Sequence, residues 1–231
     1  MDAAIVTVGD ELLAGDTTNT NATWLCDRLR DRGVDVRRVT TVPDHTGAIA
    51  RVVNEYHAEY DAVVVTGGLG PTHDDVTMNG VAAAFGRSVE PHPGAREWLT
   101  ETGGYAAADL DEGTVDLPAG ARFLPNEVGV APGAVVESAY VLPGVPAEMK
   151  AMFDRVAGEF AGERTHSVTV IADEPESALL DRMEAVQERF DVRVGSYPGE
   201  HVRLKLSGAD GDAVESAAAW LEARVESTDA D

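Results

Sequence analysis

Residues 62–75 read AVVVT followed by GGLGPTHDD, and this stretch decides the fold. Its first five residues are an apolar, β-branched run without polar alternation, which is typical of a strand buried on both faces in the middle of a sheet. Gly67, Gly68 and Gly70 follow, and a helical pattern begins near Val76. Glycine lets backbone N–H groups approach an anion closely, and a helix N-terminus adds partial positive charge. The stretch therefore predicts a central strand, a phosphate-binding loop and a helix.

Strands and helices alternate on both sides of this stretch. Upstream, β-branched runs predict strands at residues 3–8 and 34–42, each followed by an amphipathic helix. Asp44 is expected to cap the second of these helices. Downstream, short strands are expected at residues 121–124, 134–137 and 140–142, followed by a helical stripe from Met149 to Phe160. This alternation predicts a three-layer, doubly wound α/β fold around a mostly parallel sheet.

A stretch of small and polar residues at 158–165 indicates a domain boundary. The large domain is expected to span residues 1–162. Beyond it, the order strand, helix, strand, strand, helix predicts a small α+β domain of βαββα type at residues 166–227. Residues 228–231 are expected to form an acidic tail.

The composition limits the partners of this chain. Its 41 acidic residues outnumber 18 basic ones, which gives a net charge of −23, and 44% of its residues are hydrophobic. A duplex-DNA binder needs a basic footprint, so we expect no nucleic-acid partner. Sixteen of the basic residues are arginine and only two are lysine. Dispersed carboxylates with few lysines are typical of proteins from salt-loving organisms, where high salt screens self-repulsion.

Cysteine usage and hydropathy indicate the compartment. Cys26 is the only cysteine, so no internal disulfide can form, and its helical spacing with Leu25 and Leu29 predicts a buried structural thiol. The sequence shows neither a signal peptide nor an 18-residue apolar run. We therefore expect a cytoplasmic protein without a membrane partner.

Three loops should meet at one edge of the sheet, because open α/β sheets bind ligands at the carboxyl ends of their strands. They are residues 9–21, 67–75 and 142–146. The glycine loop has neither the Lys-Ser/Thr ending of a Walker A motif nor GxGxxG spacing. Asp74 and Asp75 suit a divalent cation that bridges carboxylate and phosphate oxygens. Alternatively, one of these aspartates only caps the following helix, and Asn19–Asn21 caps the first helix.

Several motifs together resemble the CinA family (competence/damage-inducible protein A). They are residues 9–13 (GDELL), 19–21 (NTN), 66–72 (TGGLGPT), 74–75 (DD), 124–126 (LPN), 131–133 (APG) and 142–149 (LPGVPAEM). The N-terminal domain of that family is similar to the molybdopterin-binding domains of the MoaB, MogA and MoeA proteins. The resemblance extends to about Phe160, and the small α+β unit resembles the middle domain of CinA proteins. His73 stands where the family often has lysine. This chain ends before the family's deamidase domain could begin, so we do not expect that reaction.

The resemblance implies a metal-dependent nucleotide pyrophosphatase that acts on ADP-ribose-like substrates. The alternatives are molybdopterin binding or adenylylation, and a noncatalytic nucleotide-binding protein. We expect a divalent metal, either Mg²⁺ or a transition metal, with molybdopterin as an alternative ligand, and a homo-oligomer by analogy. The expected catalytic residues are Asp74, Asp75 and Glu11, and the expected metal ligands are Asp10, Asp74 and Asp75. The expected phosphate or nucleotide contacts are Gly67, Gly68, Leu69, Gly70, Thr72, Asn21 and Gly144.

Overall fold

The computed structural model describes residues 1–70, 72, 74–106, 113–163 and 165–226. Pro71, His73 and the predicted acidic tail lie outside the described residues. The chain divides into two compact units, unit 1 at Met1–Gly162 and unit 2 at Glu163–Asp231. Each unit has its own hydrophobic core.

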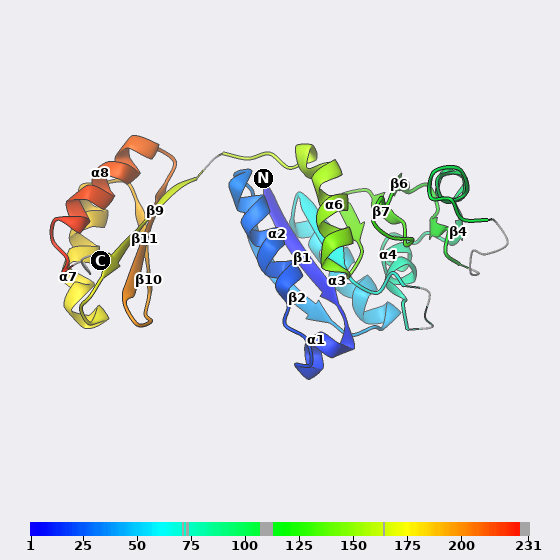
Figure 1. Ribbon diagram of the computed structural model, residues 1–231, viewed down its shortest axis with the longest axis horizontal. Helices are drawn as coiled ribbons and strands as arrows, with labels where there is room; N and C mark the ends of the chain where they lie inside the picture. Colours follow the sequence, from blue (N-terminus) through cyan, green and yellow to red (C-terminus); the bar gives the residue numbers. More distant parts are fainter. Residues whose placement is uncertain (71, 73, 107–112, 164, 227–231) are drawn as a thin grey trace. The chain divides into compact units, whose positions relative to one another are not determined.

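A six-stranded sheet forms the centre of unit 1 (Figure 1). Its strand order is β2 (Asp35–Val42), β1 (Asp2–Val8), β3 (Ala62–Thr66), β8 (Ala139–Leu142), β7 (Gly133–Val136) and β6 (Arg122–Leu124). The first four strands run parallel, and β7 is antiparallel to both neighbours. All five residues of β3 are buried, as its apolar run predicts. The predicted α/β fold with a mostly parallel sheet is confirmed.

Helices cover both faces of this sheet because successive strand residues point to opposite sides. Ala3 and Ile5 of β1 pack with α2 (Thr20–Asp31) and α6 (Pro146–Val156). Ala4, Val6 and Val8 pack in the other core with α3 (Thr46–Glu59) and α4 (Thr77–Ala84). The predicted apolar stripe from Met149 in α6 to Phe160 beyond its end is buried, and the rings of Phe153 and Phe160 stack with centroids 5.4 Å apart. The three layers follow from this alternation.

Three local features differ from the sequence prediction. His45 caps α3, because its Nδ1 accepts the Ala48 N–H at 3.2 Å, so the prediction that Asp44 caps this helix is wrong. Asp10 and Glu11 open a short helix, α1 (Asp10–Ala14), instead of lying in a loop. A two-stranded sheet of β4 (Val89–Pro91) and β5 (Asp116–Pro118) was not predicted. Between them, α5 (Pro93–Glu97) continues into a π-helical turn, η1 (Trp98–Thr102).

Cys26 is half-buried at the margin of the core, so the prediction of a buried thiol is only partly right. Burial, followed by the nearby Asp27 carboxylate, raises the pKa of this thiol. A raised pKa keeps the sulfur protonated and unreactive at neutral pH, which agrees with a structural role. Among the described residues, no helix is long and apolar enough to cross a membrane.

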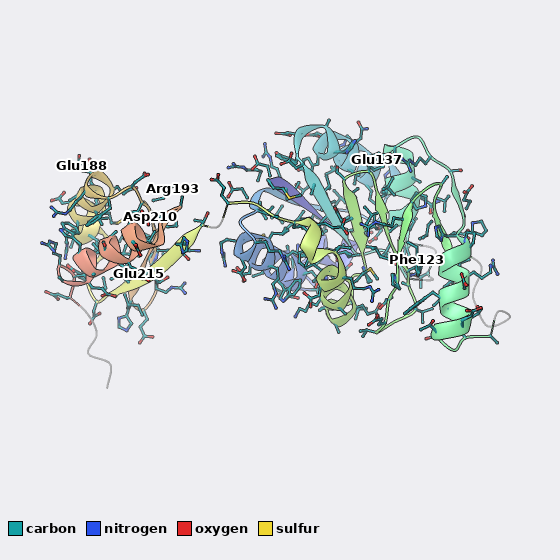
Figure 2. The ribbon with its side chains drawn as sticks, turned by 90° about the horizontal axis from the view of Figure 1, so that it is seen from above. Phe123, Glu137, Glu188, Arg193, Asp210 and Glu215 are labelled. Carbon is teal, nitrogen blue, oxygen red and sulfur yellow. The ribbon has the colours of Figure 1, made fainter. Side chains whose placement is uncertain are left out.

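Unit 2 is an antiparallel three-stranded sheet covered by two helices on one face. The sheet order is β10 (Arg193–Tyr197), β11 (Val202–Gly208) and β9 (His166–Ala172). The helices are α7 (Glu176–Arg189) and α8 (Gly211–Glu222), which carry Glu188 and Glu215 as labelled in Figure 2. Val170, Leu204 and Leu206 form the sheet side of the core with Leu179 and Leu221 from the helices. The chain order is therefore βαββα.

We predict that Gly80→Ala destabilises unit 1 although alanine favours helices by about 1 kcal/mol. A Cβ at Gly80 would lie 2.6 Å from both Cβ and Cγ2 of Ile49, where α4 crosses α3. Overpacking of this kind costs about 1–3 kcal/mol. The control is Ala83→Gly on the exposed side of the same helix, which should cost about 1 kcal/mol through propensity alone. Denaturant unfolding measures both variants, and a stabilised Gly80→Ala protein would contradict the packing argument.

Candidate functional site

The glycine loop after β3 is fixed by close contacts with its two neighbouring strands. Gly67 has φ +109°, and a Cβ there would lie 2.1 Å from the Val8 carbonyl oxygen at the end of β1. The Gly67 N–H donates to the Leu142 carbonyl at the end of β8 (3.2 Å). This N–H therefore holds the loop in place and is not available to an anion. Only glycine fits this position.

The next three residues keep their backbone donors available. Gly68 has φ +61°, and a Cβ there would lie 2.4 Å from Thr77 Oγ1 at the start of α4. The Gly68 carbonyl accepts the Thr77 N–H, which ties the loop to this helix. Among the described residues, the N–H groups of Gly68, Leu69 and Gly70 form no backbone hydrogen bond. These three donors can meet an anion.

Asn21 of α2 connects the end of β3 with the loop after β8. Its Nδ2 donates to the Gly144 carbonyl (2.7 Å) and lies 3.5 Å from Thr66 Oγ1, which itself donates to the Pro143 carbonyl (2.7 Å). Asn21 Oδ1 is buried and has no hydrogen-bond partner among the described residues. The helix cap comes from Asn19, whose Oδ1 accepts the Ala22 N–H. Asn21 is thus left to position the loops and to offer a buried acceptor.

A pocket of about 280 Å³ lies where these loops meet. The predicted site residues that line it are Glu11, Asn21, Gly67, Gly68, Asp74, Asp75 and Gly144. Four predicted residues do not line it: Asp10, Leu69, Gly70 and Thr72. Leu12, Thr17 and Thr18 from the predicted loop 9–21 also line the pocket, and so does Asp44, which was not predicted at this edge. The loops after β1, β3 and β8 therefore meet, and β2 contributes Asp44.

Asp44 is the acidic residue that the sequence analysis missed. It follows β2, whose carboxyl end lies beside that of β1, so the strand-edge rule could have found it. Its Oδ2 accepts the Asp10 N–H at 2.9 Å. Partial burial, followed by the charges of Asp10, Glu11 and Asp74, raises the pKa of Asp44. This part of the site is therefore an assembly of like charges.

The other carboxylates differ in what they contact. Asp75 Oδ2 accepts the Thr72 N–H (3.0 Å) and the Thr72 hydroxyl, so this side chain folds the loop. The N-cap residue of α4 is Val76, which makes no side-chain cap hydrogen bond. The Glu11 carboxylate folds back toward Gly9, where a Cβ would lie 2.5 Å from Oε1. Asp75 and Glu11 both line the pocket.

The donor set fits a divalent cation that completes its shell with water or phosphate oxygens. No three His, Cys, Asp or Glu side chains among the described residues are already arranged around one point as metal ligands. Mg²⁺ commonly uses one or two carboxylates plus waters and substrate phosphates, so it needs no such cluster. A cation would also offset the repulsion around Asp44. The metal-ligand assignment of Asp10, Asp74 and Asp75 stays a prediction.

The fold and the site define an open α/β ligand-binding domain, with a glycine loop and a polar pocket at the carboxyl edge of its sheet. Residues 4–163 match the family model described as probable molybdopterin binding domain, and the chain belongs to this family. Residues 164–230 match the family model described as FAD synthase, middle domain.

Individual relatives extend the comparison to the whole chain. A protein from Archaeoglobus fulgidus is 38% identical over 224 residues, covering 96% of this chain and 97% of that protein. A CinA-like protein from Citrifermentans bemidjiense is 34% identical across 97% of this chain, which spans 58% of that protein. The crystal structure of CinA, of unknown function, from Thermoplasma acidophilum aligns with a TM-score of 0.64 at 34% identity. That alignment covers 69% of this chain and 97% of the other. The predicted resemblance to CinA is confirmed.

We predict that Gly67→Ala destabilises unit 1 far more than Gly15→Ala does. Both glycines have positive φ, but a Cβ at Gly15 meets no atom within 4 Å, whereas one at Gly67 meets the Val8 carbonyl. The backbone strain costs about 1–2 kcal/mol in each case, and the clash should add at least about 1–3 kcal/mol for Gly67→Ala. Thermal unfolding of the two variants measures the difference, and equal losses would contradict the close-contact argument.

We predict that Asp44→Asn stabilises the metal-free protein at neutral pH. The raised pKa means that ionised Asp44 destabilises the folded state. This penalty is absent well below the ordinary value of 3.8 and grows as pH rises through the raised pKa. Asparagine keeps an oxygen that can accept the Asp10 N–H. The gain should be below about 1 kcal/mol because the group is largely solvated.

The measurement is denaturant unfolding in EDTA at several pH values. The stability difference between Asp44→Asn and wild type should disappear under acidic conditions. A variant that is less stable than wild type at neutral pH would show that the carboxylate is not under repulsion.

Proposed function

We propose that unit 1 binds a phosphorylated pterin of the molybdopterin class in the pocket at the carboxyl edge of its sheet. The observation that carries this proposal is the buried, unpartnered Asn21 Oδ1 in the same pocket as the glycine loop. A pterin ring offers N–H donors to such an acceptor, and its phosphate suits the backbone donor of Gly68, which lines the same pocket. The family assignment supports the same ligand class.

The cost of leaving the Asn21 Oδ1 acceptor without a hydrogen bond favours a ligand that carries a hydrogen-bond donor. A buried acceptor without a partner costs about 1–3 kcal/mol, and a ligand N–H can recover this cost. Asn21 Nδ2 is already committed to the Gly144 carbonyl, so the amide cannot rotate without losing that bond. The oxygen therefore stays directed away from Gly144. It favours a ligand group that donates a hydrogen bond over one that only accepts.

A second candidate is a metal-dependent pyrophosphatase acting on ADP-ribose-like substrates. The observation that favours it is the group of like charges that Asp10, Glu11 and Asp74 form around Asp44 at the site. A bound divalent metal would lower the pKa of a water molecule and neutralise phosphate charge. Asp10, Asp74 and Asp75 would hold the cation, and Glu11 or Asp75 would orient the attacking water.

The binding experiment compares freshly prepared molybdopterin with ADP-ribose by thermal shift and equilibrium binding. We expect molybdopterin to raise the melting temperature, and Asn21→Leu to weaken its binding about tenfold, the equivalent of about 1.4 kcal/mol for one hydrogen bond. Asn54→Ala is the control, because Asn54 bonds the Ala84 carbonyl away from the pocket. Absence of any molybdopterin binding would reject the pterin assignment.

The hydrolysis experiment incubates the protein with ADP-ribose and Mg²⁺ or Mn²⁺ and follows the release of AMP. Turnover that falls at least about a hundredfold in Asp74→Asn and in Asp75→Asn would support the pyrophosphatase. Turnover that survives both changes would reject it. ADP-ribose binding without AMP release would favour the third alternative, a noncatalytic nucleotide-binding protein.

A further inference from the structure

Within the described part of unit 2, one face of the sheet is covered by neither helix. Its helix-facing residues alternate along each strand and form the core, as Val168, Val170 and Ala172 do in β9. The residues between them point to the opposite face. Cross-strand pairing places on that face Arg193, Gly195 and Tyr197 of β10, Arg203, Lys205 and Ser207 of β11, and Ser167, Thr169 and Ile171 of β9. We call this surface the open sheet face.

Charge is divided between the two sides of unit 2. The open sheet face carries three cations, and the three strands contain no Asp or Glu. The helices on the other side carry seven acidic residues: Glu176, Asp181, Glu184, Glu188, Asp212, Glu215 and Glu222. Figure 2 labels Glu215 on α8 and Arg193 on β10. A net charge of −23 thus coexists with a locally basic surface.

The three cations are not used within the described part of the chain. No hydrogen bond or ion pair with another described residue is found for Arg193, Arg203 or Lys205. The cations on the helical side are engaged instead: Arg182 pairs with Glu174, and Arg224 lies over the Trp220 ring at 4.2 Å. In a protein with 41 carboxylates, three adjacent unpaired cations are available to an external anion.

An aromatic ring lies among these cations. A Cβ at Gly195 would be 3.1 Å from Tyr197 Cε2 and 3.2 Å from its hydroxyl oxygen, so the ring leans over the glycine along the strand. Glycine within a strand usually marks such a close approach. Tyr197 is 49% exposed, Arg203 lies directly across from it, and Lys205 lies across from Gly195. The ring therefore offers a stacking surface with cations beside it.

We propose that the open sheet face binds single-stranded nucleic acid, with a base stacked on Tyr197 and backbone phosphates on Arg203, Lys205 and Arg193. Charge complementarity favours a polyanion, and the exposed ring favours one with unpaired bases. Arg193 and Tyr197 are four residues apart, about 13 Å along a strand, so the surface is longer than one phosphate. A duplex suits it less, because paired bases cannot stack on the ring.

The test is fluorescence anisotropy of a short, labelled poly(U) strand with the full chain at low salt. Three phosphate contacts predict a slope of about −2 in a plot of log K against log salt concentration. Arg203→Gln combined with Lys205→Gln should reduce the slope to about −1 and weaken binding. Tyr197→Ala should weaken binding at least about fivefold, whereas Tyr197→Phe should preserve it.

The matched control is Arg189→Gln combined with Arg224→Gln, which removes the same charge from cations that lie over Phe190 and Trp220. This variant should retain both affinity and slope. Three results would overturn the proposal: no binding at low salt, equal losses in the control and the Arg203/Lys205 variant, or displacement of poly(U) by an equal charge of polyglutamate. The last result would assign the surface to an acidic protein.

Discussion

The contact between Gly67 and the Val8 carbonyl is the constraint on which unit 1 depends. It brings the chain out of β3 directly against the end of β1, and the Gly67 N–H joins the same point to β8. The loop then turns through Gly68 to the start of α4, where Thr77 bonds its carbonyl. Three parallel strands and a helix N-terminus are therefore fixed at one edge. A side chain at this position would separate the strands that form the pocket.

The same geometry brings the two chemistries of the site close together, because a Cβ at Gly68 would lie 3.2 Å from Asp44 Oδ1 and one at Gly70 would lie 2.6 Å from Asp75 Oδ2. Backbone donors come from the β3 loop, which is neutral at Gly68–Gly70. Carboxylates come from the ends of β1 and β2 and from the start of α4, and burial raises the pKa of Asp44 among them. A ligand phosphate at this loop would meet backbone donors and carboxylate repulsion together, unless a cation offsets the carboxylate charge. This proximity is why pterin binding and metal-dependent hydrolysis both fit one pocket and differ in their need for a metal.

Structural features that are set by residues close in the sequence could be predicted. Features that are set by residues close only in space could not. The buried β3, the stripe of α6 and the βαββα order follow from periodicity, which acts over a few residues. The cap of α3 was predicted one residue too early, because Asp44 and His45 can both cap and the contact with Asp10 decides between them. Asp44 was missed in the site because its role depends on β2 lying beside β1. The π-helical turn and the β4–β5 pair lack a local signal.

Net charge averages over surfaces that act separately, so it does not describe the charge of any one surface. Exposed charges separated by more than about 8–10 Å are largely screened at moderate salt, so a distant carboxylate has little influence on Arg203 or Lys205. The alternation VRLKLS in β11 already places both cations on the face opposite Leu204 and Leu206. Because those leucines are buried in the core, the alternation places both cations on the open sheet face. A strongly acidic chain can therefore present a basic surface wherever a two-residue repeat separates its apolar residues from its few cations.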